Sequence, residues 1–206
     1  MVLELSDFVQ ASMFSKMEKI DVTSVNRVIL DVAKGLEYLH EQGIFHGDIS
    51  GTNVLVTSEH RGKLCNFGLT RLFTDPNSVL YVTASLAQGG TMVYLAPELL
   101  LKKDGLDGKA TDAGDIYAFS MLSWELYARK PPFSDVLPND LVEHVASGER
   151  PPILNPRTSP GVRAMPGFLP DVLKRCWSDE PEYRPEASQV VRWLERQFAP
   201  VSGGRR

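Results

Sequence analysis

The chain has 206 residues, 43% of them hydrophobic, and a formal net charge of -4. This composition predicts a globular protein with a hydrophobic core, and the acidic balance argues against a nucleic-acid-binding surface. The two cysteines, Cys65 and Cys176, are far apart and indicate neither a disulfide framework nor a zinc site. The N-terminus "MVLELSDFVQ" has no basic region before its apolar run, so we expect no secretory signal and a cytoplasmic protein.

The first part of the chain predicts a strand end, a long helix and a hairpin. Residues 1–5, "MVLEL", form a short apolar run that is typical of a strand end. An apolar period of 3.6 residues runs between Asp21, a plausible N-cap, and Gly43, a plausible stop, and predicts an amphipathic helix. The glycine-rich loop 46–53 follows. Then "VLVT" and "KLCNF", separated by "SEHRG", predict two short strands joined by a turn.

The second part is mainly helical. Residues 68–95 show no sustained period and many turn-forming residues, which predicts a long functional loop. The nearly apolar stretch "IYAFSMLSWELYA" predicts a buried core helix, over 113–128, that is too short to cross a membrane. Further helices are expected near 138–147, 171–178 and 186–198. We therefore predict one mainly helical domain over 1–198 and a disordered tail over 199–206.

Five motifs occur in one order along about 140 residues: "HGDISGTN", "NFG", "APE", "DIYAF" and "CWSDEPEYRP". Together they resemble the C-terminal lobe of a protein kinase. The resemblance implies a mainly α fold, helical with short β-hairpins at the catalytic loop. The segment "GTMVYLAPE" is similar to serine/threonine kinases of the tyrosine-kinase-like group, in which Thr91 would help to shape the site for the substrate hydroxyl.

The resemblance gives roles to residues of the loop 46–53 and of the strand after it. Asp48 would accept the proton of the substrate hydroxyl, because phosphoryl transfer needs such a group beside the metal-bound phosphates. Asn53 would bring an oxygen to a magnesium ion, and Leu55 would lie beneath the adenine of ATP. For an isolated D-x-x-x-x-N pattern a simple turn would be the better interpretation, but the surrounding motifs favour the site.

Three departures from the family pattern argue against full activity. Asn66 stands in place of the aspartate of D-F-G and brings no charge to magnesium, which is usually held through carboxylates. Ser50 replaces the lysine that faces the transferred phosphate in serine/threonine kinases. Gly47 replaces the arginine that pairs with activation-loop phosphate, so a phosphate switch is not expected.

The glycine-rich ATP loop, the strand lysine and its partner glutamate have no counterpart in this sequence. By resemblance the chain begins at the hinge, so that Leu3 falls at the gatekeeper position and Glu4 and Ser6 face the adenine edge. We expect nucleotide bound without the N-terminal lobe to be open to water and poorly positioned.

Residues with structural roles match the family better. Asp115 would hold the backbone of the catalytic loop, and Glu98 and Arg184 would form a buried ion pair. For His46 and Phe67 a plain core role and a role in linking the lobes are about equally plausible. No chemistry is assigned to the remaining histidines, which are His40, His60 and His144.

Two interpretations follow. The chain is a truncated, pseudokinase-like interaction module that binds ATP and Mg2+ weakly, or it is an active serine/threonine protein kinase whose N-terminal lobe is missing from the gene model. The expected partner is a protein substrate or a binding protein, without nucleic acid or a membrane segment. An apolar patch near "MVLEL" would also permit self-association.

Overall fold

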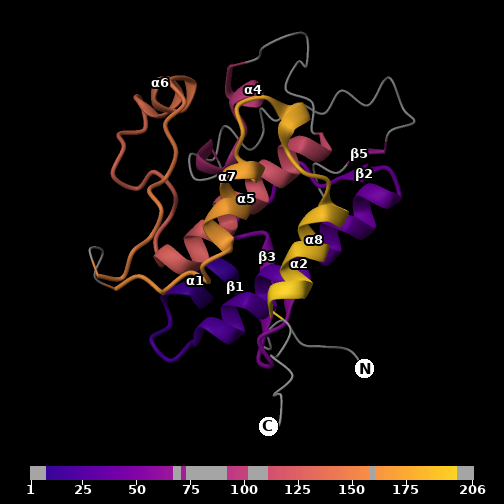
Figure 1. Ribbon diagram of the computed structural model, residues 1–206, viewed down its shortest axis with the longest axis vertical. Coiled ribbons are helices and arrows are strands. Elements are labelled where there is room, and N and C mark those ends of the chain that lie inside the picture. Colours follow the sequence, from indigo (N-terminus) through magenta and orange to yellow (C-terminus); the bar gives the residue numbers. More distant parts are fainter. Residues whose placement is uncertain (1–7, 67–70, 73–91, 102–110, 158–160, 199–206) are drawn as a thin grey trace, which may run out of the picture.

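Figure 1 shows the computed structural model, which describes residues 8–66, 71–72, 92–101, 111–157 and 161–198. Long helices form its body, and a small antiparallel sheet lies beside them. This architecture confirms the predicted mainly helical fold with short β-hairpins. None of the described helices combines the length and the apolar character that crossing a bilayer requires.

Helix α5 (Asp112–Ala128) forms the centre of the core. Its N-cap is Thr111, whose side-chain oxygen accepts a hydrogen bond from the N–H of Gly114 at 2.9 Å. Every residue from Gly114 to Ala128 is buried, as expected of a helix that is hydrophobic on all sides. Helices α1 (Ala11–Lys16), α2 (Val22–Glu41) and α7 (Leu169–Cys176) pack around it. The predicted buried core helix is therefore confirmed.

Helix α2 (Val22–Glu41) is the predicted amphipathic helix. Asp21 caps it, because Oδ1 accepts a hydrogen bond from the N–H of Ser24 at 2.8 Å. Gly43 follows the end of the helix with a φ of 68°, a left-handed conformation that glycine adopts easily. The apolar face of α2 packs against α5 and against α8 (Ala187–Phe198), and α2 and α8 lie side by side in Figure 1.

A three-stranded antiparallel sheet has the order β1–β3–β4, with bounds Phe8–Gln10, Val54–Thr57 and Gly62–Leu64. Strands β3 and β4 form the predicted hairpin, although the second strand ends earlier than expected. A Cβ atom at position 62 would lie 2.9 Å from the carbonyl oxygen of Val28, so glycine is needed where β4 approaches α2. Strand β1 was not predicted, since three residues carry no usable period.

A second, two-stranded sheet pairs β2 (Ile44–Phe45) with β5 (Arg71–Leu72). The prediction of one loop over 68–95 is therefore wrong at its described parts, because 71–72 form a strand and 92–94 a 3-10 helix. Such short elements depend on distant partners and leave no periodic signal. The remaining elements are η3 (Met92–Tyr94), α4 (Pro97–Leu101), α6 (Leu141–Ala146) and η4 (Pro181–Tyr183). The predicted strand end at 1–5 and the tail 199–206 lie outside the described residues.

Candidate functional site

The loop 46–53 connects β2 to β3 and is attached to the first turn of α5 through Asp115. The two carboxylate oxygens of Asp115 accept hydrogen bonds from the backbone N–H groups of His46 and Gly47, each at 2.8 Å. Asp115 is only 2% exposed. A buried carboxylate that accepts two backbone hydrogen bonds fixes the start of the loop relative to the core helix.

His40, in the last turn of α2, is part of this anchor. Its Nε2 lies 3.0 Å from Oδ2 of Asp115. Sequence reasoning gave His40 no role, and the sequence holds no signal for one because its partner is 75 residues away. The structure therefore adds a third contact to the anchor.

His46 links the loop to the segment after β4. It is fully buried; its Nε2 lies 3.0 Å from the carbonyl oxygen of Cys65, and its Nδ1 accepts from the N–H of Asp48 at 3.3 Å. This pattern fits a neutral ring with its hydrogen on Nε2. His46, expected only to fill core space or link lobes, thus makes polar contacts within the site. Cys65, whose carbonyl oxygen lies beside His46, is itself half-buried, and this burial raises the pKa of its thiol.

Asp48, Asn53 and Asn66 form a chain of side-chain hydrogen bonds. The Asn53 amide nitrogen donates to Oδ2 of Asp48 at 2.7 Å and to the backbone carbonyl of Asp48 at 2.8 Å. The Asn66 amide nitrogen donates to Oδ1 of Asn53 at 2.8 Å. The structure therefore brings together the predicted proton acceptor and both predicted metal-facing residues, which are up to 18 positions apart.

Ser50, predicted to occupy the place of a phosphate-facing lysine, is 2% exposed. Its hydroxyl lies 2.9 Å from the hydroxyl of Thr52, and its carbonyl accepts from the N–H of Asn53 at 3.1 Å. The side chain thus serves the turn inside the loop and carries no charge outward. Leu55, the predicted residue beneath the adenine, lies half-buried in β3.

A buried pair lies behind the loop. The hydroxyl of Tyr94 donates to Oε2 of Glu125 at 2.6 Å, and both side chains are almost fully buried. Burial is the main cause that raises the pKa of Glu125, although the hydrogen bond from Tyr94 opposes it. A Cβ atom at Gly51 would lie 2.6 Å from Oε2 of Glu125, so the loop passes directly over this carboxyl group. Sequence reasoning missed this contact, since it joins three distant segments.

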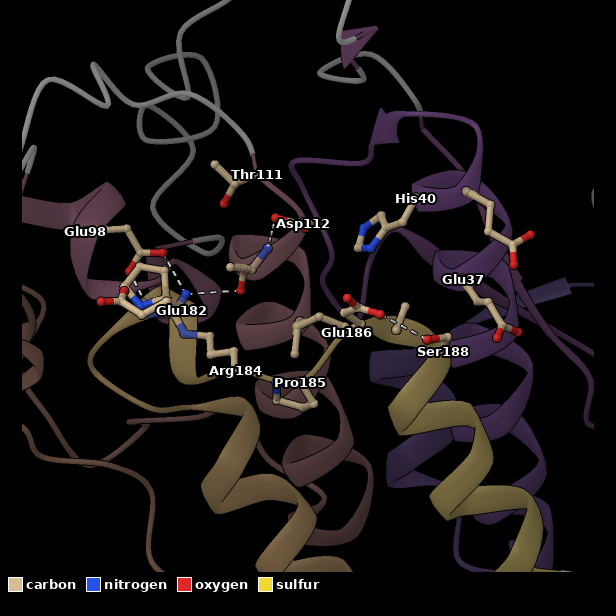
Figure 2. A pocket seen from close by; sticks show the side chains of 15 residues that line it. Glu37, His40, Glu98, Thr111, Asp112, Glu182, Arg184, Pro185, Glu186 and Ser188 are labelled. Atoms are coloured by element: carbon tan, nitrogen blue, oxygen red, sulfur yellow. Dashed lines mark hydrogen bonds and ion pairs between the residues drawn. The ribbon is translucent and has the colours of Figure 1, made fainter.

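Glu98 in α4 and Arg184 after η4 form an ion pair with two parallel contacts, of 2.6 and 2.7 Å. The side chains are 6% and 0% exposed. Arg184 also donates to the carbonyl oxygens of Ala113 and Ser178. Figure 2 shows the pair in the wall of a cavity of about 670 Å3, which His40 also lines. No residue of the loop 46–53 lines this cavity, so it is separate from the hydrogen-bond chain.

The side chains near Asp48 do not fit a magnesium ion well. Asp48 supplies the one carboxylate among the three hydrogen-bonded side chains Asp48, Asn53 and Asn66. The side-chain oxygen of Asn53 already accepts a hydrogen bond from the Asn66 amide. Mg2+ is a hard cation that demands near-octahedral oxygen geometry and usually takes one or two carboxylates. Nor does the described part of the chain contain a group of three or more His, Cys, Asp or Glu side chains that could hold a metal ion.

Several predicted site residues lie outside the described part of the chain: Leu3, Glu4 and Ser6 at the expected adenine edge, and Phe67 and Thr91 near the expected activation segment. The remaining predicted residues are those of the loop 46–53 and its hydrogen-bond chain, Leu55 in β3, Asp115 in α5 and the Glu98–Arg184 pair.

Comparison with known proteins gives a consistent result. The family model "Protein tyrosine and serine/threonine kinase" matches residues 2–194. The chain is 33% identical to Serine/threonine/tyrosine-protein kinase HT1 of Arabidopsis thaliana over 188 residues, which cover 90% of this chain and 43% of that protein. It is 32% identical to Receptor-interacting serine/threonine-protein kinase 3 of Homo sapiens over 179 residues, 85% of this chain and 33% of that protein. The chain thus spans less than half the length of these relatives.

Proposed function

Because this chain belongs to the protein tyrosine and serine/threonine kinase family, we propose that it is a kinase-like interaction module of serine/threonine lineage. In this proposal it binds a protein partner, binds ATP and Mg2+ weakly, and transfers phosphate slowly or not at all. The family uses ATP and Mg2+ and acts on proteins, and membership in it supports the proposal of a weak nucleotide site and a protein partner.

One observation carries the proposal: an amide, Asn66, stands beside Asn53 where the family has a carboxylate. Negatively charged ligands attract a hydrated divalent cation. A neutral amide in place of a carboxylate therefore weakens the binding of the metal ion and, with it, the binding of nucleotide phosphates. A metal ion contributes several kcal/mol to stabilising the charge of a transition state. Loss of even about 3 kcal/mol slows a reaction by roughly two orders of magnitude.

The alternative is an active serine/threonine kinase that works with an N-terminal lobe not contained in this sequence. The observation in its favour is the intact placement of Asp48, whose carboxylate is held by Asn53 at 2.7 Å. A positioned carboxylate of this kind can accept the proton of a substrate hydroxyl. Asp48 and Asn53 could orient a substrate hydroxyl in either interpretation. The two interpretations differ in the rate of phosphate transfer.

The test is a Mg2+-dependent phosphate-transfer assay with the purified chain and a mixed serine/threonine peptide library. We expect transfer by the unaltered protein to stay at the level of an Asp48→Asn blank. We also expect Asn66→Asp to tighten nucleotide binding in Mg2+ on the order of tenfold, because one added carboxylate ligand need contribute only about 1.4 kcal/mol. Asn139→Asp, the same chemical change at an exposed loop position, should leave nucleotide binding unchanged. Transfer by the unaltered chain well above the blank would establish the alternative.

The proposal includes association of two copies. The predicted patch near "MVLEL" lies outside the described residues, and exposed apolar side chains follow it in β1 and at α1. Val9, Met13 and Met17 are 37%, 61% and 48% exposed; Met13 lies in α1, and Met17 is the extended residue that directly follows it. Glutamate at Met13 would bring a charge into such an interface. We therefore expect Met13→Glu to abolish concentration-dependent sedimentation, while Tyr38→Glu, at a 64% exposed position of α2, leaves it intact. Sedimentation of the unaltered chain as a monomer at all concentrations would refute this part.

A further inference from the structure

The orientation of the Asn66 amide follows from the hydrogen-bond chain itself. Asn53 directs its amide nitrogen at two oxygens of Asp48, so its own oxygen, Oδ1, must face Asn66. That oxygen is an acceptor and requires a donor. The nearest group of Asn66 is therefore its NH2, at 2.8 Å.

An aspartate at position 66 could not make this contact. An ionised carboxylate has acceptor oxygens only, so it would place a negative oxygen against Oδ1 of Asn53. Two acceptors at hydrogen-bonding distance repel each other unless a cation lies between them. The amide of Asn66 thus supplies the positive end of a dipole at a place where a carboxylate would need a metal ion.

The backbone also favours asparagine here. Asn66 has a φ of 62°, in the left-handed region where asparagine and aspartate are several-fold enriched over other non-glycine residues. Exchange of asparagine for aspartate therefore changes the hydrogen bond and the charge while the backbone preference stays nearly the same. Asn53, at the centre of the hydrogen-bond chain, is only 7% exposed and makes three side-chain hydrogen bonds, while Asn66 at the end of the chain is exposed.

We propose that the Asn66–Asn53–Asp48 chain holds the loop 46–53 in its ordered geometry without a divalent cation, so that Asn66 is a positioning residue that replaces the metal ion. This inference rests on the proposed function, because it describes how the impaired site is organised. The loop is then a permanently ordered surface whose shape does not depend on Mg2+.

The experiment measures thermal unfolding of the unaltered chain, Asn66→Asp and Asn139→Asp, each with excess Mg2+ and with EDTA. We expect the unaltered chain, which binds Mg2+ only weakly, to have nearly the same melting temperature in both. Asn66→Asp should melt about 2 to 4 °C lower in EDTA, and Mg2+ should restore most of this loss. Asn139→Asp, at an exposed position, should not respond to Mg2+.

A second readout is the exchange of side-chain amide protons by NMR. In the unaltered chain the NH2 protons of Asn53 and Asn66 should exchange more slowly than those of Asn139, and Asn66→Asp should speed the exchange at Asn53. Mg2+ stabilisation of the unaltered chain as large as that of Asn66→Asp, or unprotected amide protons at Asn53 and Asn66, would overturn the inference. These results do not depend on phosphate transfer: an active chain with protected amides would remove the proposed function alone, and an inactive chain without protection would remove this inference alone.

Discussion

Arg184→Ala should lower the free energy of unfolding by about 3 to 5 kcal/mol, because it leaves Glu98 as an uncompensated buried carboxylate. The Glu98 side chain is 6% exposed, so it would lose its charged partner at a largely buried position. The carbonyl oxygens of Ala113 and Ser178 each lose the hydrogen bond from Arg184 as well. The ion pair joins the segment around α4 to the segment between η4 and α8, so its loss loosens both segments.

The matched control is Lys34→Ala. Lys34 and Glu195 form an ion pair of 2.6 Å in which both side chains are nearly half exposed. Exposed pairs contribute about 0.2 to 1 kcal/mol, so this variant should unfold close to the unaltered chain. Chemical denaturation followed by circular dichroism measures both variants. An Arg184→Ala protein with an unchanged unfolding midpoint and slope would show that the buried pair contributes no net stability.

Asp115→Ala should lower the free energy of unfolding by about 2 to 5 kcal/mol. The change removes the acceptor of the N–H groups of His46 and Gly47, and each buried donor left without a partner costs about 1 to 3 kcal/mol. His40 loses its contact with the carboxylate too. The loss should be concentrated in the loop, so amide hydrogen exchange at His46 and Gly47 should accelerate more than exchange in the interior of α5.

Asp112→Ala is the matched control for this prediction, since Asp112 lies in the same first turn of α5 but is exposed. Its carboxylate accepts a hydrogen bond from the adjacent Ala113 N–H. Removal of an exposed acid from a helix N-terminus costs about 0.3 to 1 kcal/mol, and the loop amides should stay protected. Equal protection of the His46 and Gly47 amides in Asp115→Ala and in Asp112→Ala would contradict the role of Asp115 as the anchor of the loop.

The long helices could be predicted because their signals are local. Helix α2 has a capping aspartate, a regular apolar period and a terminal glycine within 23 residues of sequence, and α5 is a continuous apolar stretch behind a threonine cap. Strands β1, β2 and β5 could not be predicted. Each has two or three residues, and its existence depends on hydrogen bonds to a partner strand that only the folded chain brings near.

The candidate site, too, could be predicted only in part. The motifs around Asp48, Asn53 and Asn66 identify the residues, because a family pattern depends on residue type and spacing, which the sequence contains in full. The contacts of His40 and of the Tyr94–Glu125 pair were not predictable, since each joins segments far apart in the chain.

By itself the sequence determined the family and the long helices, and it predicted the replacement of a metal-binding carboxylate by the neutral Asn66. Only the tertiary structure decided what that replacement does, namely that the Asn66 amide donates to Asn53 at 2.8 Å. The physical reason is that charge and residue type are properties of single positions. The direction of a hydrogen bond is set by the acceptors that surround a group, and these are assembled only when the chain folds.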